Sequence, residues 1–208
     1  MTYIISFISQ KGGVGKSTLA RSVAQELKKN DYKVRLADLD VQQGTSQEWH
    51  RRRLDNDMHP VGSVECFRTT KEALDGAETF DGVVIDGAGR SSKATYDVAT
   101  ISDIVIQPTG ASLDDLVPAV RLFHELVQKG IENKKLYIAL SRIGTAAEEE
   151  AARDYIAQAG YQVLNGCTFE KPAYRMALNA GQTITETRYD GLNDRADQLM
   201  QSIFNQLQ

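Results

Sequence analysis

The stretch Gln10-Lys11-Gly12-Gly13-Val14-Gly15-Lys16-Ser17-Thr18 decides the fold of this 208-residue chain. An apolar run at residues 3–8 precedes it and is typical of a short strand. The residues after it are apolar at a spacing typical of a helix, namely Leu19, Ala20, Val23, Ala24 and Leu27. The order is therefore strand, glycine-rich turn and helix, which is the context that a phosphate-binding loop requires.

The residue types in this loop suit the phosphates of a nucleotide. Gly12, Gly13 and Gly15 lack a Cβ, so the backbone can curl with its N–H groups pointing inward. Those donors, with the positive end of the following helix, attract a di- or triphosphate. Lys16 can reach the β- and γ-phosphates, and the Ser17 hydroxyl can ligate Mg²⁺. A chance glycine-rich turn is the alternative, and the Gly-Lys-Ser sequence at a helix start after a strand argues against it.

The composition predicts one soluble globular domain covering residues 1–208. Hydrophobic residues make up 41% and charged residues 25% of a chain long enough for one sizeable core. The net charge of −4 gives no overall basic field, so any nucleic-acid binding must use a local patch. Cys66 and Cys167 are far apart and lack metal-ligand spacing, which fits a reducing, cytoplasmic setting. We expect no signal peptide and no membrane span.

Carboxylates stand at the ends of two further apolar runs. Residues 33–40 have the pattern of a strand ending in Asp38 and Asp40, which would point the same way in a regular strand. Residues 82–89 form a second such run, in which Asp86 is followed by Gly87 and Gly89. Ligands of open α/β sheets bind at the carboxyl ends of strands, so we expect these acids to face the phosphates. A polar strand end that caps the next helix, and an ordinary Asp-Gly turn, are the respective alternatives.

The phosphate loop departs from the usual pattern at its first two residues. Gln10 stands where the pattern G-x-x-x-x-G-K-[ST] has glycine, and Lys11 adds a second lysine. The form K-G-G-x-G-K-S resembles the deviant Walker A motif of the ParA/MinD group of ATPases. In that group the first lysine reaches the nucleotide of a partner subunit. The resemblance therefore implies that Lys11 acts in trans.

The resemblance continues after the second predicted strand. Asp38, Asp40 and Gln42 fit the group's D-x-D-P-Q stretch, with Val41 in place of proline, and Trp49 follows as in short members. The resemblance implies that Asp40 positions or activates the attacking water. It also implies the remaining site residues, which are Ser17, Asp38 and Asp86 for Mg²⁺ and, for ATP, residues 11–18 (with Val14 and Thr18) together with Arg142, Lys171 and Pro172. Its catalytic residues would be Lys11, Lys16 and Asp40.

Basic residues offer several candidates for nucleic-acid contact. The candidates for DNA binding are Lys171, Arg175, Arg188 and Arg195. The cluster at residues 51–53 is either a solvated helix face or a contact with DNA or a partner. Asp114 is either the acid that the group has at its dimer interface or a plain first-turn acid of a helix at residues 115–129.

Strands and helices alternate along the rest of the chain. Further strands are predicted at residues 64–67, 104–108, 136–140 and 161–164, and further helices at residues 70–78, 146–159 and near the C-terminus. The last helix has an apolar stripe and few cations on its polar face, which favours core packing over membrane binding. The expected fold is a three-layer α/β P-loop NTPase domain with a mainly parallel central sheet flanked by helices.

The resemblance implies an ATPase that uses ATP and Mg²⁺ to partition or position DNA. It would form a homodimer on binding ATP, hold DNA without sequence preference, and act with a ParB-like adaptor or centromere-binding protein. Its location would be cytoplasmic and nucleoid-associated, with no membrane. Two alternatives stay open, a MinD-like membrane-associated positioning ATPase and a monomeric P-loop phosphotransferase. An iron–sulfur reductase is disfavoured because neither cysteine closely follows Asp86.

Overall fold

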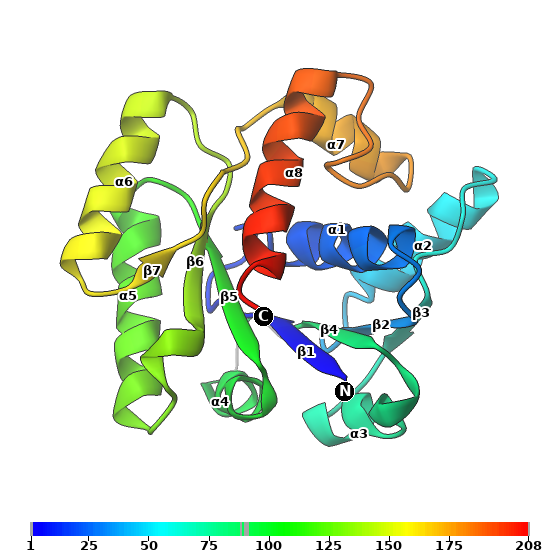
Figure 1. Cartoon of the computed structure of the whole chain (residues 1–208), viewed down its shortest axis with the longest axis horizontal. Coiled ribbons are helices and arrows are strands. Elements are labelled where there is room, and N and C mark those ends of the chain that lie inside the picture. The colour runs from blue at the N-terminus through cyan, green and yellow to red at the C-terminus, as the bar shows by residue number, and fades with distance from the viewer. Residues whose placement is uncertain (1, 88, 90–91, 208) are drawn as a thin grey trace.

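A single parallel sheet forms the centre of the molecule. The computed structural model describes residues 2–87, 89 and 92–207. Every pairing among the described strands is parallel, and their order is β3-β2-β4-β1-β5-β6-β7 (Figure 1). The strands are β1 (Tyr3–Phe7), β2 (Val34–Asp38), β3 (Ser63–Cys66), β4 (Gly82–Asp86), β5 (Ile104–Thr109), β6 (Leu136–Leu140) and β7 (Gln162–Val163).

Helices cover both faces of the sheet, because each face presents apolar side chains that must be buried. One face packs against α1 (Lys16–Lys29), α2 (Thr45–Asp55), α7 (Pro172–Asn179) and α8 (Asp190–Phe204). The other packs against α3 (Thr70–Leu74), α4 (Ser92–Ile101), α5 (Leu113–Gln128) and α6 (Ala146–Gln158). Two short 3₁₀ turns lie at Ala77–Thr79 and Asn133–Lys135. The predicted three-layer α/β architecture is confirmed.

The sheet register brings the expected functional segments to one edge. In the register of β1, β2 and β4, Phe7 and Asp38 both lie beside Asp86. Because the strands are parallel, the phosphate loop after β1, the acids at the carboxyl ends of β2 and β4 and the turn after β6 all lie at this same edge. All five residues of β4 are buried, as expected for a central strand covered on both faces.

Two predicted elements have different ends in the structure. The strand expected over residues 33–40 ends at Asp38, because the Asp38 carboxylate accepts the backbone N–H of Asp40 and turns the chain. The expectation that Asp38 and Asp40 share one orientation is therefore wrong. The helix expected over residues 70–78 ends at Leu74, and Gly76 with φ of 67° breaks it. Glycine adopts such a left-handed conformation at little cost.

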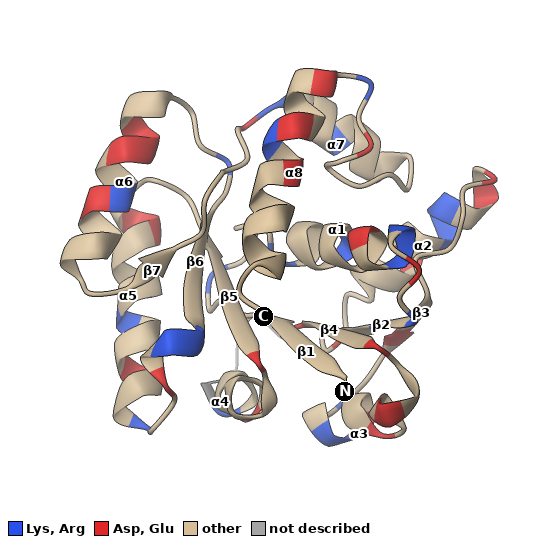
Figure 2. Cartoon of the chain, in the orientation of Figure 1, with Lys and Arg blue, Asp and Glu red and all other residues tan. Residues whose placement is uncertain are grey.

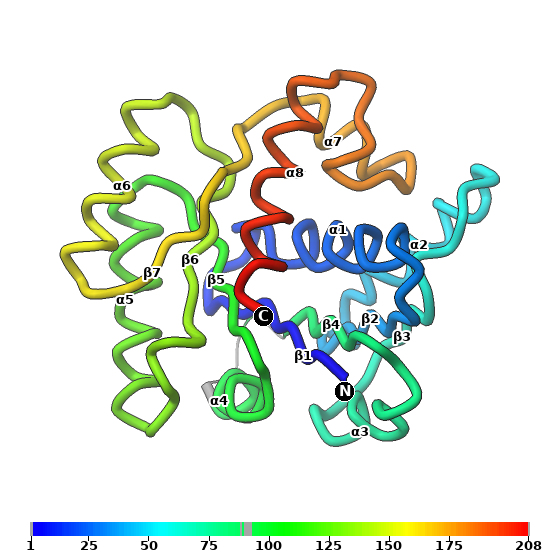
Figure 3. Tube along the Cα trace, viewed as in Figure 1, coloured from blue at the N-terminus to red at the C-terminus, as the bar shows by residue number. Residues whose placement is uncertain are grey.

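The last helix packs into the core as predicted. Its buried residues are Ala196, Leu199, Met200, Ser202 and Ile203. They belong to the cluster that also holds the buried face of α1. Tyr3 and Leu207 line one shallow cavity, so the two ends of the described chain lie close together (Figure 3). No helix in the described part of the chain is both long and apolar enough to cross a bilayer.

Candidate nucleotide-binding site

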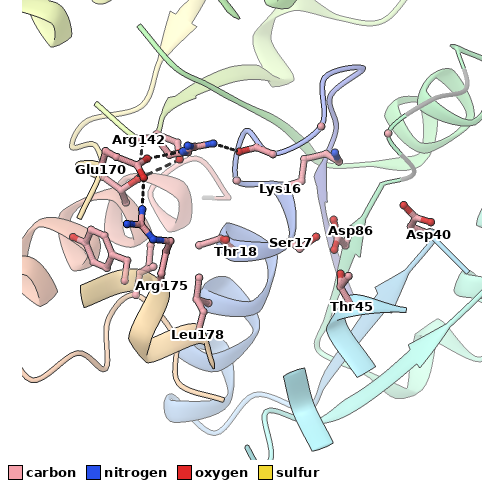
Figure 4. A pocket seen from close by; sticks show the side chains of 18 of the residues that line it. Lys16, Ser17, Thr18, Asp40, Thr45, Asp86, Arg142, Glu170, Arg175 and Leu178 are labelled. Atoms are coloured by element: carbon pink, nitrogen blue, oxygen red, sulfur yellow. Dashed lines mark hydrogen bonds and ion pairs between the residues drawn. The ribbon is translucent and has the colours of Figure 1, made fainter. Parts of the chain in front are cut away.

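A cavity of about 500 Å³ lies at the carboxyl edge of the sheet. Figure 4 shows that Ser17, Asp86, Asp40 and Thr45 gather at one end of it, and Arg142, Glu170 and Arg175 at the other. The predicted site residues that line it are Gly12, Gly13, Gly15, Lys16, Ser17, Thr18, Asp40, Asp86, Arg142, Lys171 and Arg175. Those that do not are Lys11, Val14, Asp38, Pro172, Arg188 and Arg195.

The phosphate loop has the backbone that its glycines predict. Gly13 and Gly15 have φ of 76° and 106°, a conformation that side chains rarely adopt. A Cβ on Gly15 would lie 2.7 Å from the Ser141 hydroxyl, so the close approach of the turn after β6 also favours glycine there. The helix α1 begins at Lys16, and no side chain caps its first turn. Its free N–H groups therefore face the cavity as an anion-binding end.

Oxygen donors suited to Mg²⁺ lie beside this helix end. Asp86 is 3% exposed, and burial raises its pKa to about 6, with a further contribution from the charge of Asp38. The Ser17 hydroxyl and the charges of Arg21 and Lys16 oppose that rise. Among the described residues, no group of three or more His, Cys, Asp or Glu is placed to hold a metal ion. The fit is thus to a cation held by one hydroxyl, one carboxylate and the phosphates themselves, as Mg²⁺ usually is.

The two acids at the end of β2, Asp38 and Asp40, have different contacts. Asp38 is buried, and its carboxylate accepts the N–H of Asp40 at 2.9 Å and that of Ser46 at 3.1 Å. It thereby fastens both ends of the loop that carries Asp40. Asp40 is half-buried and lines the cavity near Asp86 (Figure 4). Asp38 therefore stabilises the conformation of this loop and does not itself line the cavity.

An ion-pair chain closes the opposite end of the cavity. Arg142 donates from Nε to Glu170 at 2.6 Å and from a terminal nitrogen to the Gly13 carbonyl at 2.8 Å. Arg175 of α7 pairs with the same Glu170. The hydrogen bond from Arg142, with the charges of both arginines, holds the pKa of Glu170 below its usual range. Apolar side chains complete this end, and they are Phe169, Tyr174, Leu178 and Ile184.

Lys11 lies outside this cavity, in a neighbouring one of about 630 Å³. Its Nζ forms an ion pair with Asp115 and donates to the Asp114 carbonyl at 3.3 Å. Burial acts to raise the pKa of Asp115, but hydrogen bonds from Lys11 and Ser112 outweigh it and lower that pKa. Asp114 itself lies in the first turn of α5, where its backbone carbonyl, not its carboxylate, meets Lys11.

The basic residues expected at the surface are not equivalent. Arg188 contacts the Tyr189 hydroxyl, and Arg195 lies over the Phe169 ring. In Figure 2 the basic positions on α7 and on the segment that leads into α8 lie at the same end of the molecule. Within residues 51–53, Arg51 is exposed beside Glu48, but Arg53 is 2% exposed and paired with Glu186. Neither a solvated face nor a DNA contact describes Arg53.

Several residues at the site were missed in the sequence. Glu170 joins Arg142 to Arg175, and Asp115 holds Lys11. Gln43 and Thr45 line the cavity beside Asp40. An acid directly before Lys171-Pro172 and a second acid directly after Asp114 were visible signals, whereas neither partner of these ion pairs could be assigned without the fold.

The family model of the CobQ/CobB/MinD/ParA nucleotide-binding domain matches residues 5–183. The chain belongs to this family. The match spans the phosphate loop, Asp40, Asp86 and the segment of α7, which are parts that line the cavity. No curated protein matches the sequence.

Solved structures share the fold at low sequence identity. The MinD septum site-determining protein of Pyrococcus horikoshii with Mg-ADP is 19% identical with a TM-score of 0.74, over 98% of this chain and 96% of that one. Apo McdA of Cyanothece is 16% identical with a TM-score of 0.72, over 98% and 100%. A plasmid partition protein of Borrelia burgdorferi with AMPPNP is 16% identical with a TM-score of 0.71, over 98% of each chain.

Proposed function

We propose that this protein is a Mg²⁺-dependent ATPase that dimerises on binding ATP, holds DNA without sequence preference, and partitions or positions DNA with an adaptor protein. One observation carries the proposal. The phosphate loop, Asp86 and Asp40 line one cavity. Lys11, the first of the two lysines in the loop, lies outside that cavity. Because Lys11 does not line the nucleotide cavity of its own subunit, it is available to contact the nucleotide bound to a partner subunit.

The site residues have separable roles in this proposal. Lys16 and the loop N–H groups bind and orient the phosphates. Ser17 and Asp86 would hold Mg²⁺, which would neutralise part of the negative charge of the phosphates. Asp40, fastened by Asp38, orients the attacking water and accepts its proton. The apolar wall of Tyr174, Leu178 and their neighbours suits a nucleobase.

Similar proteins support the nucleotide and the cellular task. The related MinD structure contains Mg-ADP, and that of the related plasmid partition protein contains AMPPNP. The choice of DNA as cargo rests on the cations of α7 and its flanks, since Lys171 and Arg175 are exposed at the mouth of the cavity. DNA bound there would lie next to the nucleotide and respond to its state.

A MinD-like membrane positioner is the second candidate, favoured by the likeness to MinD. The apolar stripe of α8 counts against it, because Leu199, Met200 and Ile203 are at most 2% exposed and pack with α1. A helix that binds a bilayer needs that stripe free. A liposome sedimentation assay with ATP separates the two candidates, since the proposed ATPase stays in the supernatant.

The decisive experiment measures DNA binding with ATP, with ADP and without nucleotide. We expect binding only with Mg²⁺-ATP, and a steep loss of affinity with added salt because counterion release drives it. Lys16→Ala removes the cation at the phosphates, so nucleotide affinity should fall roughly 10- to 100-fold and DNA binding should disappear. Full nucleotide affinity in that variant, or DNA binding that ignores nucleotide, would sink the proposal.

A further inference from the structure

A buried arginine stands behind the candidate metal site. Arg21 lies on α1 four residues after Ser17, hence on the same helix face, and it is 7% exposed. Burial lowers its pKa to about 10, with Asp86 and Asp38 acting in the opposite direction, so it is charged at neutral pH. Neither Arg21 nor Ser46 is among the described residues that line the cavity. Arg21 therefore has no direct route to a bound nucleotide.

Arg21 is connected through Ser46 to the carboxylates of Asp38 and Asp86. Arg21 donates from Nε to the Ser46 hydroxyl at 3.2 Å, and that hydroxyl lies 3.3 Å from the Asp86 carboxylate. Because a guanidinium can only donate, the single hydroxyl proton of Ser46 must point to Asp86. The Ser46 N–H meanwhile donates to Asp38 at 3.1 Å. One residue of α2 thus joins both buried carboxylates to the guanidinium.

The charge balance explains why an arginine is needed here. Asp38 and Asp86 are 1% and 3% exposed and lie on neighbouring strands, so each penalises the charge of the other. Arg21 is a buried cation close to both carboxylates, on the side away from the cavity. Its guanidinium also lies 5.5 Å from the centre of the Trp49 ring. A guanidinium tolerates such a partly apolar position better than an ammonium, because it is more weakly hydrated.

We propose that Arg21 is a positioning residue of the metal site: it is the resident counter-charge of the Asp38–Asp86 pair and, through Ser46, it orients the Asp86 carboxylate for Mg²⁺. The inference rests on the proposed Mg²⁺-nucleotide function. Its charge alone would repel a divalent cation, whereas the orientation it imposes favours one. The two effects have opposite signs, so the sign of the change in Mg²⁺ affinity distinguishes them.

The first test measures the Mg²⁺ dependence of binding of a fluorescent ATP analogue. We expect Arg21→Met to raise the Mg²⁺ concentration at half-saturation at least tenfold, while affinity in EDTA, set by Lys16 and the loop, stays within twofold. Arg21→Lys keeps the charge but loses the fixed Nε donor to Ser46, so it should recover little of the loss, and Ser46→Ala, which removes the link to Asp86, should share it. Unchanged or tighter Mg²⁺ binding in Arg21→Met overturns the proposal.

The second test uses the nucleotide-free protein and thermal unfolding. Arg21→Met leaves two buried carboxylates uncompensated, so its Tm should fall by roughly 6–20 °C. Adding Asp86→Asn removes one of those charges and still leaves Ser46 an acceptor, so it should restore much of the loss. Strictly additive Tm changes would overturn the counter-charge role. If the wild-type protein binds no nucleotide, the proposed function fails. The Tm values of the nucleotide-free variants would still test whether Arg21 compensates the charge of Asp86.

Discussion

At the scale of single residues, Arg53 differs most from its prediction, because the sequence predicts an exposed side chain and the structure buries it. Its guanidinium forks onto Glu186 at 2.7 and 2.8 Å and also donates to the carbonyls of His59 and Gly181. A Cβ on Gly181 would overlap the Arg53 backbone, so the two segments touch directly. This buried pair fastens the segment before α8 to α2, on the same side of the sheet as the cavity.

Removing one partner of this pair should destabilise the protein strongly. Arg53→Ala removes the guanidinium from the half-buried Glu186 carboxylate and leaves the His59 and Gly181 carbonyls without their donor, so the free energy of unfolding should fall by roughly 2–4 kcal/mol. Arg51→Ala is the matched control, because Arg51 lies two positions away in an exposed pair with Glu48 and such pairs contribute little. Urea denaturation measures both variants, and equal losses would contradict the assignment.

The same pair predicts a pH dependence. Burial acts to raise the pKa of Glu186, but hydrogen bonds from Arg53 and Thr183 outweigh it and lower the pKa below its ordinary 4.5. A lowered carboxyl pKa adds stability above 4.5 that is lost as the pH falls through the folded-state pKa. The wild type should therefore exceed Glu186→Gln in stability at pH 7, and the difference should shrink below about pH 4.5. A difference independent of pH from 7 to 3 would refute this.

At the scale of elements, α7 joins the nucleotide cavity to the surface. Pro172 occupies its first turn, where the missing N–H costs nothing, and the helix then turns Tyr174 and Leu178 toward the cavity. Arg175 extends from the same turns toward solvent and Glu170. An eight-residue helix therefore carries the apolar wall and a candidate DNA contact together.

Arg175→Ala should weaken nucleotide-dependent DNA binding on every sequence to a similar extent. A lost phosphate contact reduces the slope of log affinity against log salt by about 1. Arg121→Ala is the control, since Arg121 is exposed on α5, across the sheet from α7, and should leave affinity and slope unchanged. Fluorescence anisotropy with two unrelated duplexes measures both. A loss confined to one duplex would indicate base recognition instead.

At the scale of the whole molecule, the order of the strands separates the two loop lysines. Helix α5 follows β5 on one side of the phosphate loop and brings Asp115 to Lys11, while Lys16 points into the cavity. An isolated subunit therefore holds Lys11 with its own acid. In the proposed dimer this ion pair must exchange for a contact with the partner's nucleotide.

Lys11→Ala should spare nucleotide binding by single subunits and abolish the dimer. Each symmetric interface would lose the same charge-assisted contact twice. Sedimentation with Mg²⁺-ATP tests this, with Lys29→Ala as a control because Lys29 is an exposed lysine at the far end of α1. A normal ATP-dependent dimer in Lys11→Ala would leave the monomeric phosphotransferase as the better reading.

Asp40→Ala should separate assembly from hydrolysis. The phosphate loop, Ser17 and Asp86 stay intact, so the variant should bind ATP, dimerise and stay on DNA. Phosphate release should fall roughly 100-fold or more, because the water loses its orienting base. Steady-state phosphate assays with the sedimentation above report both steps. A normal rate of ATP hydrolysis in Asp40→Ala would show that Asp40 does not orient the attacking water.

The features that could be predicted from the sequence are those that depend on neighbours along the chain. The phosphate loop, the central strands at β4 and β6 and the buried stripe of α8 follow from glycine chemistry and hydrophobic periodicity, which act within a few residues. The helix α4 escaped notice, because its residues from Ser92 to Ile101 mix small and polar types without a strong stripe.

The pairing of charged side chains could not be predicted without the three-dimensional fold. The sequence predicts Arg53 at the surface, but the side chain is buried. The Asp38 carboxylate binds backbone N–H groups and does not line the cavity, and Lys11 pairs with the Asp115 carboxylate and not with that of Asp114. These pairings join segments separated by up to 133 residues, as for Arg53 and Glu186. Charged residues look alike in sequence whether solvated or buried, because only the packing of distant elements removes the water and supplies the partner.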